Sequence, residues 1–346
     1  MSYIALNISL AGQDSSYMAD FLLSKGYKVW ALIRKTTSII EKHQNVCHLI
    51  DNPHLTIRFG DLNDSISLTT VIQEIKNTYP DLIRLEIYNF GAISHVGLSF
   101  KLPELTVSTN ALGPLRLLEA IRLSGFQDKI RFLNCSSSEQ FGNVLETPQN
   151  EKTPFNPVSI YASAKTFAYY ITKNYREAYN IFACSSICFN HESSRRDPIF
   201  VTRKITKGLA DIVHGRSQKL VLGNINSFRD MTHAKDCIRA MHLMMCQDKP
   251  EDFVISSDET HCIREFLEKA FLLKGFNIKW KGEGLNEIGY DENTGRELIF
   301  ISEEFFRPTE VNLLLGDSTK ARSVLGWKPE YTFDDLIKEM VDHDDH

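Results

Sequence analysis

The alternation of short apolar runs with helical patterns constrains the fold of this 346-residue sequence more than any other feature. Between the runs, apolar residues recur at helical spacing, as Leu68, Val71 and Ile72 do. Strands that alternate with helices need crossover connections, so the sequence predicts a doubly wound, Rossmann-type α/β domain whose parallel sheet is covered on both faces. The expected strands are Ile4–Ile8, Val29–Ile33, Leu55–Phe59, Leu85–Phe90, Ile130–Cys135 and Phe182–Phe189.

The second half of the chain lacks the regular alternation of expected strands and helices. After about residue 190, glycine-punctuated loops separate helices expected around Thr202–Val213, Ala234–Met245 and Ile263–Leu273. We therefore expect a dinucleotide-binding domain over residues 1–190 and a smaller, mixed α/β substrate lobe over residues 191–346. Parts of the later chain can thread back into the first domain.

Charge, hydropathy and cysteine usage narrow the class of protein. The net charge of −5 provides no basic field for nucleic acid, and no apolar run approaches the ~18 residues of a membrane span. Seven cysteines without a Cys-x-x-Cys pair fit neither a disulfide framework nor a zinc motif, so no metal is expected. The N-terminus lacks a signal-peptide pattern, which favours a cytoplasmic protein. We expect the last residues, 342–346, to form a frayed, solvated tail.

The turn after the first expected strand is a candidate phosphate loop. Backbone amides and a helix N-terminus at such a turn can hold a pyrophosphate. A Gly-x-x-Gly-x-x-Gly frame keeps only Gly12, with Ser9 and Ser15 in the outer positions. By itself the loop is equally typical of an ordinary strand-to-helix turn.

Two further strand ends indicate which dinucleotide would bind. The second strand ends at Arg34, Lys35 and Thr36, where NAD-binding sheets usually place a carboxylate on the ribose 2′-hydroxyl. Cations suit a 2′-phosphate instead, so NADP is favoured over NAD, although a solvated basic strand end is a common alternative. Asp61 and Leu62 follow the third strand and are placed to receive the adenine edge.

Tyr161 and Lys165 form the candidate catalytic pair. The two residues are four positions apart and lie on one face of the predicted helix. The ammonium group of Lys165 is therefore expected to lower the pKa of the Tyr161 phenol toward that of a general base. A second pair, Tyr169 and Lys173, lies farther along the helix, away from the strand ends. The run Ser136-Ser137-Ser138-Glu139 directly follows the strand Ile130–Cys135, which delivers hydroxyls and a carboxylate to the same crevice.

The order of these features resembles the extended short-chain dehydrogenase/reductases and, within them, the GDP-mannose 4,6-dehydratases. The resemblance covers nearly the whole chain. Supporting stretches are Gly12-Gln13-Asp14, Gly60-Asp61-Leu62, Ser94-His95-Val96, Asn174-Tyr175-Arg176-Glu177-Ala178-Tyr179-Asn180, Phe189-Asn190-His191-Glu192-Ser193, Phe200-Val201-Thr202-Arg203-Lys204-Ile205, Arg307-Pro308-Thr309-Glu310-Val311 and Leu325-Gly326-Trp327-Lys328-Pro329.

The resemblance implies a lyase that converts GDP-mannose to GDP-4-dehydro-6-deoxy-mannose, on the route to 6-deoxyhexoses such as those of GDP-fucose or GDP-rhamnose. Tyr161 would be the base at the 4-hydroxyl while hydride passes to NADP+, and Lys165 would hold the ribose. Glu139 would move the proton from carbon 5 to the departing 6-hydroxyl, and Ser137 would bond the 4-oxygen. The family also implies a homodimer or homotetramer.

The resemblance further assigns residues to the two ligands. The residues expected at NADP are Gly12, Gln13, Asp14, Arg34, Asp61, Leu62, Ser94, Tyr161, Lys165, His191 and Arg196. The residues expected at the nucleotide-sugar are Asn190, Thr202, Lys204, Arg229, Arg307 and Glu310.

The chain departs from the family pattern at the margins of its sites. Besides Ser9 and Ser15, the departures are Ile93, Gly97, Ser194, Asp197 and Met231-Thr232. They leave cofactor affinity in question more than reaction type. The alternatives are a related nucleotide-sugar reductase or epimerase, which would need no base at Glu139, and an inactive NADPH-binding sensor. Joint retention of Ser137, Glu139, Tyr161 and Lys165 favours the dehydratase.

Overall fold

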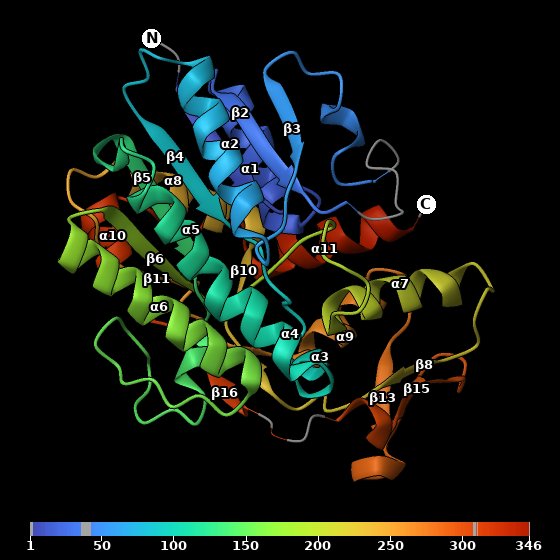
Figure 1. Ribbon diagram of the computed structural model, residues 1–346. Helices are drawn as coiled ribbons and strands as arrows, with labels where there is room; N and C mark the ends of the chain where they lie inside the picture. The colour runs from blue at the N-terminus through green and yellow to red at the C-terminus, as the bar shows by residue number, and fades with distance from the viewer. Residues whose placement is uncertain (1–2, 36–42, 307–308, 310, 346) are drawn as a thin grey trace.

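A seven-stranded parallel sheet forms the centre of the molecule (Figure 1). The computed structural model describes residues 3–35, 43–306, 309 and 311–345. The strand order is β11-β6-β5-β4-β1-β2-β3, and every neighbouring pair is parallel. The strands are β1 (Ile4–Ile8), β2 (Lys28–Ile33), β3 (Leu55–Phe59), β4 (Leu85–Asn89), β5 (Ile130–Cys135), β6 (Phe182–Cys188) and β11 (Phe253–Ile255). The predicted doubly wound sheet is confirmed, with six strands at or within one residue of their expected bounds.

Helices cover both faces of this sheet because its strands are apolar on both sides. Ile4, Leu6 and Ile8 of β1 pack on one face, whereas Ala5 packs on the other. The first face is covered by α2 (Ser65–Thr78), α5 (Gly113–Arg122) and α6 (Ile160–Tyr179), and the second by α1 (Gln13–Ser24), α8 (Ala234–Cys246) and α10 (Thr319–Leu325). Two short helices, α3 (Val96–Lys101) and α4 (Pro103–Val107), precede α5.

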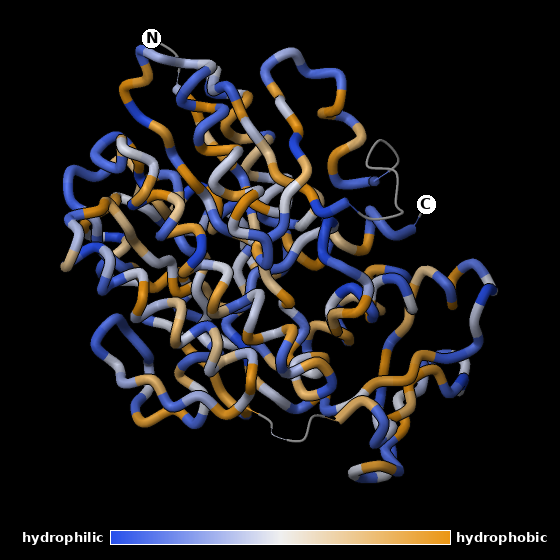
Figure 2. Tube along the Cα trace, in the orientation of Figure 1, coloured by the Kyte–Doolittle hydropathy of each residue, from blue (hydrophilic) through white to orange (hydrophobic). Residues whose placement is uncertain are grey.

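A second lobe lies beside the carboxyl ends of the strands, at the lower right of Figure 1. It has its own hydrophobic core, formed by helices on a four-stranded sheet of order β13-β14-β15-β8. Its elements are α7 (Val201–Val213), β8 (Leu220–Leu222), α9 (Ile263–Leu272), β13 (Ile278–Lys281), β14 (Ile288–Asp291), β15 (Glu297–Ile301) and α11 (Phe333–Asp344). Figure 2 shows hydrophobic stretches recurring along strands and helices, with hydrophilic residues in many outer loops.

Two small sheets lie between these parts. β7 (Asn190–Glu192) pairs in parallel with β10 (Met231–His233), and β9 (Phe228–Arg229) lies between β12 (His261–Cys262) and β16 (Leu313–Leu314). The chain after residue 190 also returns to the central sheet through α8, β11 and α10. The domain boundary at residue 190 stays a prediction.

Residues 342–345 are ordered rather than frayed. Asp344, at the end of α11, accepts from the Arg203 guanidinium at 2.6 Å and from the Thr206 hydroxyl at 2.6 Å, and Arg203 is only 1% exposed. Asp345 pairs with Lys274 at 2.6 Å. The expected frayed tail is therefore wrong for residues 342–345, because a buried arginine needs a carboxylate partner. Within the described ranges, no helix is both long and apolar enough to span a membrane.

Candidate active site

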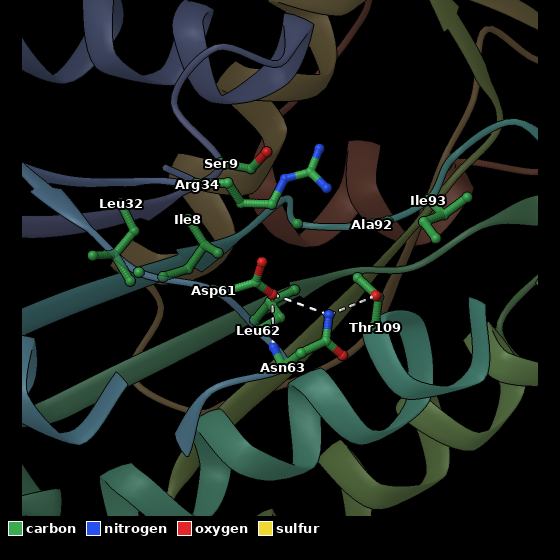
Figure 3. Close-up of a pocket in the computed structure, with 12 residues that line it drawn as sticks. Ile8, Ser9, Leu32, Arg34, Asp61, Leu62, Asn63, Ala92, Ile93 and Thr109 are labelled. Atoms are coloured by element: carbon green, nitrogen blue, oxygen red, sulfur yellow. Dashed lines mark hydrogen bonds between the residues drawn. The ribbon is translucent and has the colours of Figure 1, made fainter. Parts of the chain in front are cut away.

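A pocket opens at the carboxyl edge of the central sheet, where β1 to β4 end (Figure 3). Ser9, Arg34 and Asp61, which follow β1, β2 and β3, all face it. The complete lining is Ile8, Ser9, Leu32, Arg34, Gly60, Asp61, Leu62, Asn63, Gly91, Ala92, Ile93 and Thr109. The pocket thus brings the predicted dinucleotide residues of three strand ends together.

The turn after β1 has an unusual backbone. Ser9 adopts φ +73°, in the left-handed region that disfavours side chains other than glycine. Its amide donates to the carbonyl of Leu32 at 3.0 Å, and the amide of Gly12 closes the turn onto the Ser9 carbonyl at 3.0 Å. Helix α1 then begins after Gly12 with no side chain capping it. The first-turn amides of α1 are therefore left to a ligand or to water.

Ser15 differs from Ser9, although both replace a glycine of the expected frame. It lies inside α1, where the backbone is helical, and its side chain is fully buried. Its hydroxyl has no hydrogen-bond partner in the structure. Strain from a positive φ therefore applies at Ser9 and not at Ser15.

A partly buried ion pair joins the first turn of α1 to β7. Asp14 Oδ2 lies 3.0 Å from Nε2 of His191, whose Nδ1 lies 2.8 Å from the carbonyl of Phe189. Burial would raise the pKa of Asp14, but the His191 charge and its hydrogen bond outweigh burial and lower that pKa to about 2. Burial would lower the pKa of His191, and Asp14 instead raises it to about 9. Both ring nitrogens of His191 therefore carry protons at neutral pH.

Gln13 makes a parallel connection. Its side-chain amide donates to the carbonyl of His191 at 3.1 Å and accepts from the Ser193 hydroxyl at 2.8 Å. Residues 13 and 193 are 180 positions apart in the sequence. These contacts fasten the candidate phosphate turn to the strand that leads into the second lobe.

The candidate adenine side of the pocket is held by Leu62 and Asp61. A Cβ at Gly91 would lie 2.5 Å from the Leu62 side chain, so the glycine is needed for Leu62 to pack at 5% exposure. Asp61 Oδ1 accepts from the backbone and the side-chain amide of Asn63, at 2.8 and 3.0 Å. The same Asn63 amide donates to Thr109 at 3.1 Å (Figure 3). The carboxylate is thereby aimed toward the pocket.

The turn after β5 brings the predicted catalytic residues together. Ser137 caps the short helix η5 (Ser138–Phe141) by accepting from the amide of Glu139 at 3.3 Å, and its hydroxyl also hydrogen-bonds the Tyr161 phenol. Lys165 Nζ donates to the carbonyl of Cys135 at 2.7 Å and lies 5.9 Å from the centre of the Tyr161 ring. Tyr161 and Lys165 are 8% and 6% exposed, and Glu139 is half-buried.

The pKa of Tyr161 differs from the sequence expectation. Burial of the phenol raises its pKa above the usual value, and this effect exceeds the opposing effects of Lys165 and Ser137. Lys165 therefore acts in the expected direction without bringing the net pKa down. The expectation failed because it counted the cation and not the loss of solvent around the phenol.

Four of the six predicted nucleotide-sugar residues lie on β7, α7 and β9. Thr202 is buried and donates its hydroxyl to Glu192 at 2.7 Å, and Glu192 lies 3.1 Å from the Arg196 guanidinium. Lys204 Nζ lies 3.2 Å from the centre of the Phe305 ring, and burial lowers its pKa. Asn190 is partly exposed on β7.

The remaining predicted residues are divided between described and undescribed positions. Arg229 is 5% exposed on β9, and its Nη1 donates to the carbonyl of Phe228 at 2.9 Å. Ser94 is exposed in the loop before α3. Arg307, Glu310 and Thr36 lie outside the described residues.

Comparisons with known proteins identify the family of this chain. The family model described as GDP-mannose 4,6 dehydratase matches residues 9–340. This chain belongs to that family. The GDP-mannose 4,6 dehydratase of Dictyostelium discoideum is 47% identical over 346 residues, which cover 99% of this chain and 95% of the relative.

Solved structures resemble the chain in fold over its full length. The dTDP-glucose 4,6-dehydratase of Bacillus anthracis, in complex with NAD, superposes with a TM-score of 0.79 at 21% identity and covers 99% of this chain and 96% of its own. RMD from Pseudomonas aeruginosa, complexed with NADPH, gives a TM-score of 0.73 at 19% identity and covers 99% of each chain. At these identities the likeness shows the fold alone.

Sequence reasoning missed two residues, Gln140 and Asn110, that stabilise the turns after β5 and β4. Gln140 is fully buried, and its side-chain oxygen accepts from the Ser136 hydroxyl and, at 3.0 Å, from the Ser137 amide. Asn110 bonds both backbone groups of Ile93, at 2.8 and 3.0 Å. Gln140 completes a capping box with Ser137, and that Ser-x-x-Gln spacing was the signal in the sequence. Asn110 carried no such local signal.

Proposed function

We propose that this chain removes water from GDP-mannose to give GDP-4-dehydro-6-deoxy-mannose, with NADP as a cofactor regenerated in each turnover. The observation that carries the proposal is the carboxylate of Glu139 beside the Ser137, Tyr161 and Lys165 cluster. A reductase or epimerase needs only the tyrosine and the lysine. Removal of water needs a further group that takes a proton from carbon 5 and gives it to the 6-hydroxyl.

Each residue of the cluster has a role that follows from its chemistry. Tyr161 takes the 4-hydroxyl proton, while Ser137 hydrogen-bonds the 4-oxygen. Lys165 favours the phenolate through its charge. Glu139 takes the carbon 5 proton, which the adjacent 4-ketone makes acidic, and delivers it to the departing 6-hydroxyl. The proton held by Tyr161 balances the one returned to carbon 5, so both residues end as they began. Bound NADP+ supplies the hydride acceptor at carbon 4 and afterwards the hydride donor at carbon 6.

The pocket at the end of β1 to β4 fits the dinucleotide. The uncapped start of α1 suits a pyrophosphate, and the Asp61 and Leu62 wall suits adenine. Arg34 is exposed where β2 ends and lines the same pocket, which supports a 2′-phosphate and hence NADP.

Cofactor preference is tested by titration with NADPH and NADH. We expect the unmodified chain to bind NADPH more tightly than NADH. The Arg34→Asp variant should show a smaller difference between the two affinities. Arg58→Asp is the matched control, because Arg58 is the second-last residue of the neighbouring strand β3 but pairs with Glu74 at 2.9 Å on the surface. Equal affinity of the unmodified chain for both cofactors would exclude the NADP assignment.

The activity is tested by incubating the purified chain and NADP+ with GDP-mannose. Mass spectrometry should show a nucleotide-sugar product lighter by one water, without net accumulation of NADPH. A product of unchanged mass would indicate an epimerase, and stoichiometric NADPH would indicate a simple dehydrogenase. An unchanged substrate alongside tight NADPH binding would support the sensor alternative.

The chain is further proposed to self-associate in the cytoplasm. Leu105 of α4 and the α6 residues Phe167 and Tyr170 are 46%, 42% and 50% exposed, which supports burial against a second copy. The seven cysteines are free thiols, as in a reducing compartment. Light scattering at micromolar concentration should give the mass of a dimer or tetramer.

A further inference from the structure

Three cysteines and a histidine gather beneath the candidate cofactor turn. Cys188 ends β6, His191 lies on β7 and Cys237 lies on α8, and their ligand atoms all lie within 4.8 Å of one another. The thiol of Cys188 also hydrogen-bonds the thiol of Cys135 at the end of β5. All three cysteines are buried: Cys188 is 2% exposed, Cys237 1% and Cys135 7%. The proposed reaction uses none of these thiols.

We propose that Cys188, Cys237 and His191 form a binding site for a thiophilic metal ion of the zinc and cadmium class, with Cys135 as the fourth ligand. Thiolate and imidazole are the ligands that such ions prefer, and four of them complete a tetrahedral shell. With metal–sulfur bonds of about 2.3 Å, tetrahedral ligands lie about 3.8 Å apart. The ligand atoms of Cys188, His191 and Cys237, which lie within 4.8 Å of one another, therefore need to approach one another by about 1 Å.

Two features distinguish this set of ligands from cysteines scattered through a hydrophobic core: the elements that carry the ligands, and a carboxylate beside the histidine. The ligands come from rigid elements that pack in one core cluster, since β5, β6 and α8 all contribute to it. His191 already has a carboxylate, Asp14, at 3.0 Å. A carboxylate bonded to a metal-binding histidine is the arrangement that orients such ligands in known metal sites.

Metal binding must change the contacts of His191. Its two ring nitrogens now face Asp14 Oδ2 at 3.0 Å and the Phe189 carbonyl at 2.8 Å. A metal ion must take one of these nitrogens, so it breaks the contact that this nitrogen makes. Ligation therefore displaces the histidine ring that contacts Asp14 in the first turn of α1.

The cluster also touches the catalytic pair. The carbonyl of Cys135 accepts the hydrogen bond of Lys165 at 2.7 Å, so a shift of Cys135 toward a metal ion would displace the lysine. We therefore infer that an ion bound at the cysteine cluster inhibits the enzyme, because it disturbs the contacts of both Asp14 and Lys165. The binding claim is independent of the proposed function, whereas the inhibition claim rests on it.

Cadmium titration of the reduced, full-length protein tests the binding claim. The ultraviolet charge-transfer absorption of cadmium–thiolate bonds reports ligation without any need for activity. We expect saturation at one ion per chain, and at least about a tenfold loss of affinity in Cys188→Ala and in Cys237→Ala. Thermal unfolding of each variant checks that a lost signal does not reflect a lost fold, and the two variants provide independent tests.

Cys246→Ala is the matched control. Cys246 is an exposed thiol 3.8 Å from Nδ1 of His242, so it offers a second cysteine–histidine contact that a soft ion could use. Loss of the signal in Cys246→Ala, its survival in both buried-site variants, or no binding at all would overturn the proposal. Disulfide formation without cadmium uptake would also overturn it. If cadmium binds as expected but the chain shows no dehydratase activity, only the proposed function fails.

Discussion

The turns after β1 and β5 lie at the same edge of the sheet but are stabilised in different ways. The turn after β5 is fixed locally, because Ser137 and Gln140 satisfy its backbone within four residues. The turn after β1 has no capping side chain and contains Ser9 at φ +73°. Its order comes from distant partners, since Asp14 contacts His191 177 positions away. The candidate catalytic turn is thus preorganised by its own sequence, whereas the candidate cofactor turn depends on the second lobe.

The largest expected effect concerns the turn after β5. Glu139→Gln should lower water elimination by about 10²- to 10⁴-fold, the usual contribution of a general base. Hydride exchange at carbon 4 should persist, because Tyr161 and Lys165 remain. The measurement is product formation by mass spectrometry, together with transfer of deuterium from carbon 4 to the cofactor. Glu177→Gln, on the exposed surface of α6, is the control, and near-normal water loss in Glu139→Gln would refute the assignment.

The Gln140→Ala variant tests whether the turn after β5 is stabilised locally. The change leaves the Ser136 hydroxyl and the Ser137 amide without their buried acceptor, at a cost of about 1–3 kcal/mol. We expect kcat to fall more than KM changes, because the variant misplaces Ser137 and Glu139 and leaves the cofactor turn intact. Denaturant unfolding and steady-state kinetics measure the two effects. Unchanged NADPH affinity is required, and a loss of that affinity would show that the two turns are not independent.

The dependence of the turn after β1 on β7 predicts a pH effect. Because Asp14 raises the pKa of His191 to about 9 and has its own pKa lowered to about 2, the pair contributes its full stability between about pH 4 and 6.5 and loses it as pH rises through 9. The His191 shift corresponds to at most about 3.5 kcal/mol at ~1.4 kcal/mol per pKa unit. Asp14→Asn should therefore flatten the fall in unfolding free energy between pH 6.5 and 9.

Asp128→Asn serves as the control for that experiment, because Asp128 is exposed and far from the pair in the loop before β5. Denaturant unfolding of the three proteins at pH 6, 7.5 and 9 gives the comparison. Equal slopes for the unmodified chain and Asp14→Asn would mean that the ion pair does not stabilise the fold.

The smallest effects separate the two serines of the turn after β1. Ser9→Gly removes the cost of a left-handed serine, so it should stabilise the protein by about 1 kcal/mol and tighten NADPH binding by up to about fivefold. Ser15→Gly should instead destabilise it by about 1 kcal/mol, because Ser15 lies within α1. Weaker NADPH binding in Ser9→Gly would indicate that the serine hydroxyl contacts phosphate and outweighs the strain.

The same contrast explains what the sequence could predict. Short apolar runs mark β1 to β6, so these strands were predicted closely even though the edge strand β3 is only partly buried, whereas the three-residue β11 was too short to stand out. The grouping of Ser137, Glu139, Tyr161 and Lys165 followed from the rule that parallel strands end at one edge. The Asp14 and His191 pair and the cysteine cluster join distant segments, for which spacing carries no signal. Arg307 and Glu310 remain predictions.

The return of the chain to the central sheet limits how this protein can be divided. β11 completes the sheet edge beside β6, and α8 covers the face that holds Cys184 and Cys188, yet both come after residue 190. A fragment ending at residue 190 would leave that face bare and would lose most of β7 together with its partner β10. The cofactor half is therefore not a transferable module. Recombination with a relative should succeed only when these returning segments are exchanged together with the first 190 residues.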